Sequence, residues 1–171
     1  APEDTATPTP APEDTATPTP GPTATPEPGL LASEPFDYTT GSLGGNGGGT
    51  GWSDSWSGSN QVQSPGLTYS GLSVSGNRAA VDGSSASFRD LDQSYSSSSE
   101  IWISFLGQSD SVSPSIWNGI ALFNGSTETF FMGVPYQSSS PVKWGLDVKT
   151  GSGTNLSGAN VDSNVTLCVV R

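Results

Sequence analysis

The sequence lacks histidine altogether and contains a single cysteine, Cys168, among its 171 residues. Without histidine, the chain can form no Ser-His-Asp or Cys-His catalytic pair and no histidine-ligated zinc or copper site. One cysteine cannot close a disulfide within the chain, so cysteine usage does not indicate a redox compartment. A metal site in this protein would have to be built from carboxylate and carbonyl oxygens.

Basic residues are also scarce, because 5 lysines and arginines stand against 16 acidic residues and leave a net charge of -11. A surface of this sign repels nucleic-acid phosphates and anionic lipid headgroups. The chain also has no stretch approaching the ~20 apolar residues that span a membrane. We therefore expect no nucleic-acid partner and no membrane insertion.

Residues 1–29 differ in composition from the rest of the chain and predict a separate stalk or linker. The ten residues APEDTATPTP occur twice without a change and are followed by GPTATPEPG, with no aromatic and no basic residue. Proline fixes its own φ and biases the preceding residue toward extended backbone, so this segment favours an extended polyproline II rod. The rod is either an acidic spacer or an O-glycosylated structural strand. The candidate O-glycosylation sites are Thr5, Thr7, Thr9, Thr15, Thr17, Thr19, Thr23 and Thr25.

Residues 30–171 predict one all-β domain, because no apolar pattern persists at helical spacing. Short apolar runs separated by Gly, Asn and Asp are typical of antiparallel strands. The predicted strands cover 34–38, 67–74, 78–81, 85–91, 100–106, 119–123, 128–134, 142–148 and 165–170. A domain of about 140 residues buries close to two-thirds of its unfolded surface. We therefore expect a single antiparallel β-sandwich.

Two of these segments carry the clearest packing signals. Ile101, Ile103 and Phe105 alternate with residues on the other face, which predicts a strand between two layers. Three consecutive apolar residues at 130–132 predict a strand that is buried on both faces or that contains a bulge.

Several runs of residues after the stalk are typical of one domain family. They are EPFDYTTGSL at 34–43, the glycine-rich run at 44–49, TGWSDSW at 50–56, LTY at 67–69, GNRAA at 76–80, IWISFL at 101–106, GIALFNG at 119–125 and WGL at 144–146. With these runs, residues 34–171 resemble a concanavalin A-like (laminin G-like) jelly-roll domain of exported bacterial surface proteins. The resemblance implies two packed antiparallel sheets, an extracellular location, and a role in carbohydrate binding, adhesion or surface structure.

The last predicted strand, from Val165 to Val170, is apolar and is followed only by Arg171. Members of the resembling family usually continue with an acidic turn and further strands. Three explanations stay open: the sequence is part of a longer protein, a neighbouring subunit supplies the missing strands, or the domain is a shortened variant. Because an unpaired apolar edge invites pairing with another chain, we expect self-association or neighbouring subunits at this strand.

The acidic residues do not form a catalytic pattern. Glucan hydrolases of the concanavalin A-like class carry E-x-D-x-x-E on one strand, and this sequence has no such spacing. Asp90 and Asp92 share a face but lack a third member, so we expect solvated side chains, no enzyme and no cofactor. A calcium ion bound at the rim of the loops is an alternative that stays open, and no set of ligands is assigned to it. The carboxylates in or beside predicted loops are Asp54, Asp82, Asp110, Asp147 and Asp162.

The five tryptophans fall into two groups. Trp102 and Trp144 lie inside apolar strands and are expected in the core. Trp52, Trp56 and Trp117 lie in polar loops, where a flat aromatic face can stack on the C–H face of a sugar, so they are the sugar-stacking candidates. N-glycosylation sequons begin at Asn124, Asn155 and Asn164.

Two functional hypotheses follow for an exported, non-catalytic protein at the cell surface or outside the cell. In the first, the chain is a structural subunit of a glycosylated fibre or sheath, with a stiff Thr-Pro rod and packed β-sandwiches. In the alternative, it is a carbohydrate-binding or adhesion module displayed on a glycosylated linker.

Overall fold

The structure, a computed structural model, describes residues 29–81, 85–95, 100–110, 113, 115, 117–138, 140–148 and 153–171. Residues 1–28, with the eight candidate threonines, lie outside the described residues. The described part of the chain forms eleven strands and no helix, and so it contains no helix long and apolar enough to span a membrane. The strands are β1 (Gly41–Ser42), β2 (Ser57–Gly58), β3 (Gln61–Gln63), β4 (Arg78–Ala80), β5 (Ser87–Phe88), β6 (Ile103–Gly107), β7 (Asn118–Asn124), β8 (Thr127–Val134), β9 (Lys143–Val148), β10 (Gly153–Asn160) and β11 (Thr166–Val170).

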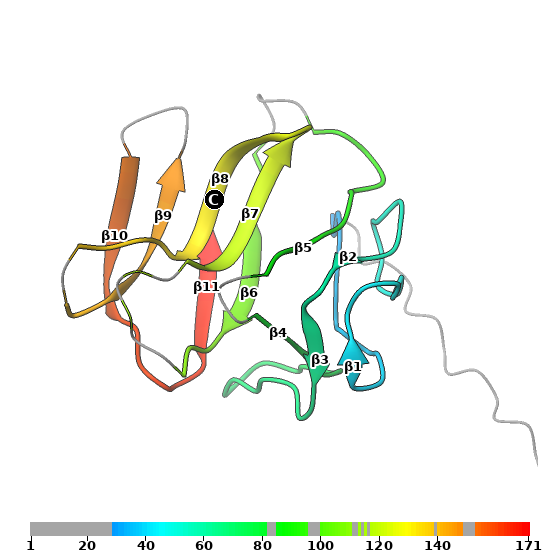
Figure 1. Cartoon of the computed structure of the whole chain (residues 1–171), viewed down its shortest axis with the longest axis horizontal. Helices are drawn as coiled ribbons and strands as arrows, with labels where there is room; N and C mark the ends of the chain where they lie inside the picture. The colour runs from blue at the N-terminus through cyan, green and yellow to red at the C-terminus, as the bar shows by residue number, and fades with distance from the viewer. Residues whose placement is uncertain are drawn as a thin grey trace, which may run out of the picture.

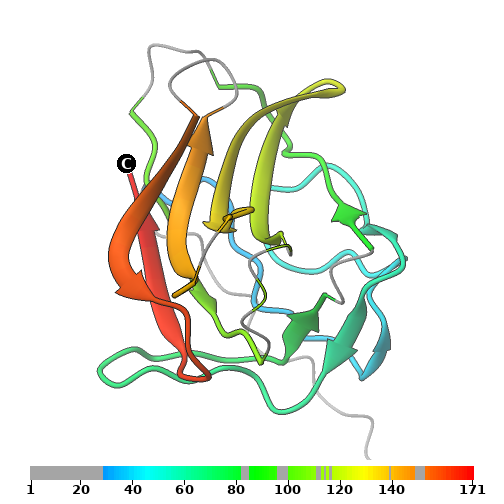
Figure 2. The same ribbon diagram turned by 60° about the vertical axis from the view of Figure 1, so that its left-hand side comes forward.

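These strands make several antiparallel sheets, which confirms the predicted all-β class and is consistent with a β-sandwich. Hydrogen-bonded neighbours follow the orders β10-β9-β8-β7, β11-β6, β1-β3-β4 and β2-β5. The four-stranded sheet lies in front of β6 and β11, and the short strands β1 to β5 form the other half of the domain (Figure 1). In the view turned by 60°, β11 and β10 lie along one side of the molecule (Figure 2).

The core lies between the four-stranded sheet and the β6–β11 pair. Val134, Val142, Trp144 and Val161 are each at most 7% exposed, and Cys168 of β11 packs against them. The Trp144 ring approaches β6 so closely that a Cβ added at residue 107 would lie 2.8 Å from it. Only glycine fits there, so the expectation that Trp144 is a core residue is confirmed.

The predicted double burial at 130–132 is also confirmed. Phe131 and Met132 point to opposite faces of β8 and are 7% and 3% exposed. The register between β7 and β8 shifts between Leu122 and Phe123, so a bulge lies beside this run. Met132 therefore lies on one face of β8 and Phe131 on the other, where the Trp117 ring contacts Phe131.

Trp102 contradicts the sequence expectation, because its side chain is 63% exposed. It lies just before β6, where its Nε1 donates a hydrogen bond to Glu100 at 3.0 Å and Arg171 covers its ring at 5.7 Å. The alternation at 101–106 predicted a strand between two layers. In the structure, only the face of β6 that carries Ile103 and Phe105 packs on the other sheet, so the Trp102 face is left outside.

Three strand predictions also need correction. Residues 34–38 and 67–74 form irregular loops, and Asp90 and Asp92 lie beyond the end of β5, so they do not share a strand face. Strand β10 was not predicted, because GTNLSGAN has no apolar alternation. It forms because β9 offers a free edge for main-chain hydrogen bonds.

Cys168 makes stability depend on pH at alkaline values. Burial raises the pKa of the Cys168 thiol from 9.0 to about 11, so the folded state favours the protonated form. This stabilisation is complete below pH 9 and is lost as the pH rises toward 11. We expect the free energy of unfolding to fall by about 1–2 kcal/mol over this pH range. This is less than the free energy that corresponds to the whole change in pKa, because the thiol is only half-buried and solvent screens it.

Urea denaturation at several pH values between 8 and 11 measures this loss. The Cys168→Ala variant provides the control, because it removes only the thiol and keeps every other titratable side chain. An equal pH dependence in the two proteins would contradict the assignment to Cys168.

Candidate binding groove

A buried ion pair organises the loops of the N-terminal half. Arg89, just after β5, donates from Nη1 to Glu34 Oε2 at 2.6 Å, and the two side chains are 2% and 8% exposed. The guanidinium also donates to the carbonyl oxygens of Gly48 and Asp54, each at 2.7 Å. The pair therefore ties the loop before β1, the loop between β1 and β2, and the end of β5 together.

The same carboxylate collects two more donors. Glu34 Oε2 accepts hydrogen bonds from Tyr38 Oη and Trp56 Nε1, both at 2.8 Å. Burial and, next, the hydrogen bond to Glu34 raise the pKa of the Tyr38 hydroxyl above its usual value. We call Glu34, Tyr38, Trp52, Trp56 and Arg89 the Glu34–Arg89 cluster. Its donors satisfy a charge that would otherwise be costly to bury.

Two of the three sugar-stacking candidates, Trp52 and Trp56, belong to this cluster. The Arg89 guanidinium lies 5.1 Å from the Trp52 ring and 5.9 Å from the Trp56 ring, within the range of a cation–π contact. Phe36 stacks on Trp56 at 6.0 Å, and Trp52 Nε1 donates to the carbonyl oxygen of Ser33 at 3.0 Å. Both rings are half-buried and engaged within the chain, which favours a packing role.

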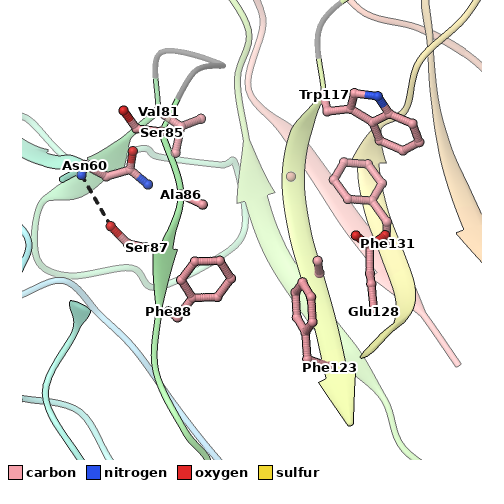
Figure 3. Close-up of a pocket in the computed structure, with 12 residues that line it drawn as sticks. Asn60, Val81, Ser85, Ala86, Ser87, Phe88, Trp117, Phe123, Glu128 and Phe131 are labelled. Atoms are coloured by element: carbon pink, nitrogen blue, oxygen red, sulfur yellow. Dashed lines mark hydrogen bonds between the residues drawn. The ribbon is translucent and has the colours of Figure 1, made fainter. Parts of the chain in front are cut away.

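The third candidate, Trp117, lies in a different place, at a groove between β5 and the β7–β8 hairpin (Figure 3). The groove has a volume of about 370 Å³. We call it the aromatic groove. Its lining residues are Asn60, Val81, Ser85, Ala86, Ser87, Phe88, Trp117, Gly119, Ala121, Phe123, Glu128 and Phe131.

Four aromatic rings line this groove as two edge-to-face pairs. Phe88 meets Phe123 across the groove, with ring centroids 5.7 Å apart at 78°. Trp117 meets Phe131 at 4.9 Å and 87°. Phe131 is buried, but Phe88, Phe123 and Trp117 are 51%, 43% and 39% exposed. The groove thus presents large apolar faces to solvent, next to each other and on different strands.

Polar groups lie between and beside these rings. Asn60 is 7% exposed, its backbone N–H donates to Ser87 Oγ at 3.3 Å, and its buried Oδ1 has no hydrogen-bond partner. Ser85 and Glu128 complete the polar lining, and Glu128 lies opposite Phe123 in the β7–β8 ladder. The groove therefore combines apolar faces with amide, hydroxyl and carboxylate groups, the mixture typical of small-ligand sites.

Sequence reasoning placed Phe88 and Phe123 in strands but did not identify them as site residues. A strand pattern predicts which residues share a face. It does not predict which of the two faces remains exposed in the folded structure. Asn60 had no sequence signal at all, because it reaches the groove through the pairing of β3 with β4 and the bond to Ser87.

The other predicted positions lie apart from the groove or at its end. The sequons Asn124, Asn155 and Asn164 are exposed on β7, on β10 and before β11. The described carboxylates include no group of three that could hold a metal ion. Asp147 was expected near a loop but is 7% exposed within β9, whereas Asp82 lies outside the described residues.

Comparisons with known proteins add no further information about the site. No protein-family model, no curated protein sequence and no solved structure matches this chain.

Proposed function

We propose that this chain is an exported, non-catalytic carbohydrate-binding module that uses the aromatic groove. In this proposal the β-strands form a concanavalin A-like jelly roll, and the Thr-Pro segment is the linker that displays it outside the cell. One observation carries the proposal: Phe88, Phe123 and Trp117 are exposed together around a groove that also holds Asn60.

The groove suits a sugar for a physical reason. A pyranose ring has apolar C–H faces and a rim of hydroxyls, so it gains from aromatic faces and from polar groups at the same time. Trp117 and Phe123 supply such faces, and Asn60 and Ser85 supply amide and hydroxyl groups. The net charge of -11 favours neutral over anionic glycans, because acidic sugars would be repelled.

A binding role without catalysis is the simpler assignment. Glycoside hydrolysis requires two carboxyl groups that flank the scissile bond. Among the residues that line the aromatic groove, Glu128 is the one carboxylate. We therefore assign Glu128 to hydrogen bonding with ligand hydroxyls.

The proposal predicts loss of glycan binding when the exposed rings are removed. We expect Trp117→Ala and Phe123→Ala each to weaken binding by about 10- to 100-fold, since removal of one stacking surface costs roughly 1.4–2.8 kcal/mol. A glycan array with neutral oligosaccharides identifies the ligand, and calorimetry measures the affinities. Tyr136→Ala is the matched control, because Tyr136 is 53% exposed and lies outside the groove.

Two results would reject this function. One is a folded wild-type protein that retains no neutral glycan. The other is binding that survives both groove substitutions but is lost in Trp52→Ala or Trp56→Ala, which would move the site to the Glu34–Arg89 cluster.

A structural subunit of a glycosylated fibre or sheath is the second candidate. The observation that favours it is the edge of β11 that faces away from β6: no other strand among the described residues pairs with it, so it offers backbone groups to another chain. Intact mass of the protein from its native source, before and after deglycosylation, tests the decorated rod. A mass above 17.4 kDa that falls in sugar-sized steps supports this candidate, and electron microscopy of the native material tests for fibres.

A further inference from the structure

Strand β11 has a regular hydrogen-bonded ladder on one side only. Its five residues pair with β6 without interruption, from Thr166 opposite Gly107 to Val170 opposite Ile103. No other strand in the described ranges bonds to β11, so within these ranges its second edge presents N–H and C=O groups that no strand pairs. That edge lies along one side of the molecule in Figure 2.

The neighbouring edge strand β10 is protected against pairing, and β11 is not. The register of β10 is interrupted between Leu156 and Asn160, and Ser157 Oγ bonds to the backbone of Ala159 within the strand. Bulges and polar residues of this kind are how edge strands avoid other chains. Strand β11 is straight in register and reads TLCVV. Because β11 has no such bulge or polar residue at its centre, its edge is suited to pairing with a strand of another chain.

The surface around this edge is apolar. Val169 points away from the core and is 53% exposed, and Trp102 on the adjacent chain segment is 63% exposed. Arg171, which follows β11, forms an exposed ion pair with Glu100 at 2.9 Å. The edge is therefore locally close to neutral, although the whole chain carries a net charge of -11 that repels a second copy elsewhere.

We propose that the free edge of β11 pairs with β11 of a second copy, antiparallel and about a two-fold axis at Cys168. In this register Val169 faces Leu167 of the second copy. Arg171 faces Val165 of the second copy, which lies three residues after Asp162 in the sequence. Opposite charges then meet at both ends of the ladder. A parallel pairing would instead place Arg171 beside Arg171 of the second copy, so charge complementarity selects the antiparallel arrangement.

Such an interface has defined consequences. A two-fold contact uses the same surface on both copies and closes, so this contact alone gives a dimer, and a fibre would need a second contact elsewhere on the surface. Because five residues bury a small area, we expect a weak dimer with a Kd in the micromolar range or above. The dimer carries two aromatic grooves and two stalks, which increases the avidity for a repetitive ligand. The interface itself stands whether or not the groove binds a glycan.

The test uses the full chain and measures mass against concentration by sedimentation equilibrium. We expect a monomer–dimer equilibrium that tightens with added salt, because screening reduces the repulsion between two chains of charge -11. Val169→Lys should raise the Kd at least tenfold, since it replaces the apolar contact with Leu167 of the second copy by a charged ammonium group, next to Arg171 on the same strand. The matched control is Leu156→Lys on β10, where the replaced side chain is 48% exposed.

A second measurement identifies the contact. Hydrogen exchange should show that the amides of β11 that face away from β6 become protected as the concentration rises. Thermal melting checks that both lysine variants remain folded. A chain that stays monomeric, a dimer unaffected by Val169→Lys, a dimer lost equally in Leu156→Lys, or a dimer without new protection in β11 would each overturn the proposal.

Discussion

Replacing Arg89 by methionine is expected to destabilise the fold by about 3–5 kcal/mol, because the Glu34 carboxylate would remain buried without its cation. The pair is 2% and 8% exposed, and the guanidinium makes four hydrogen-bonding contacts of 2.6–3.5 Å, to Glu34, Tyr38, Gly48 and Asp54. Methionine keeps much of the apolar volume, so the loss reports mainly on charge and hydrogen bonding.

A double-mutant cycle separates these contributions. Glu34→Gln alone leaves the guanidinium unpaired, and Glu34→Gln with Arg89→Met should cost less than the sum of the single changes. Glu100→Gln is the control, because it breaks an exposed ion pair: Glu100 is 56% exposed and its partner Arg171 is 64% exposed. Exposed pairs contribute less than about 1 kcal/mol. Urea denaturation measures all four variants. An Arg89→Met variant no less stable than Glu100→Gln would show that the buried pair does not hold the loops.

The Glu34–Arg89 cluster also positions the aromatic groove. Arg89 follows Phe88 directly in the chain, so the loops that fix the guanidinium also fix the backbone that presents the Phe88 ring. Arg89 contacts the Trp52 ring, and its neighbour Phe88 contacts the Phe123 ring. This side of the groove lies on a two-residue strand, and side-chain contacts to loops keep it in place, because β5 alone has too few main-chain hydrogen bonds to do so.

The sequence predicted the C-terminal half of the fold better than the N-terminal half, for a physical reason. Strands β6 to β9 and β11 bury apolar residues against a second layer, and burial leaves a readable period of two. Residues 34–60 are held mainly by Glu34, Arg89 and the two tryptophan side chains, and such contacts between distant residues leave no period in the sequence.

The same distinction explains the candidate site. Trp117 was predicted from its polar neighbours and does line the groove. Trp52 and Trp56 have similar neighbours, but the nearby Arg89 and Phe36 occupy their faces, which only the tertiary structure reveals. Trp102 was assigned to the core from alternation, although alternation cannot tell whether a second layer covers each face of a strand.

The second large effect concerns Trp144, the largest side chain of the core cluster. It is 7% exposed, packs between the two layers, and contacts the β6 backbone at Gly107. We expect Trp144→Ala to destabilise the protein by about 3–5 kcal/mol, from lost burial and from the cavity left between sheets that strand pairing holds in place. At the upper end of this range, a domain of ordinary stability would be partly unfolded at room temperature.

Trp144→Phe provides the matched control, because the Trp144 Nε1 group is buried without a hydrogen-bond partner. Phenylalanine removes this unsatisfied donor, which offsets part of the lost volume, so we expect a cost of less than about 1.5 kcal/mol. Denaturant unfolding of both variants distinguishes packing from polarity. If Trp144→Phe were as destabilising as Trp144→Ala, the indole nitrogen would have to be bonded in solution, and the contact between β9 and β6 would depend on that bond more than on the volume of the ring.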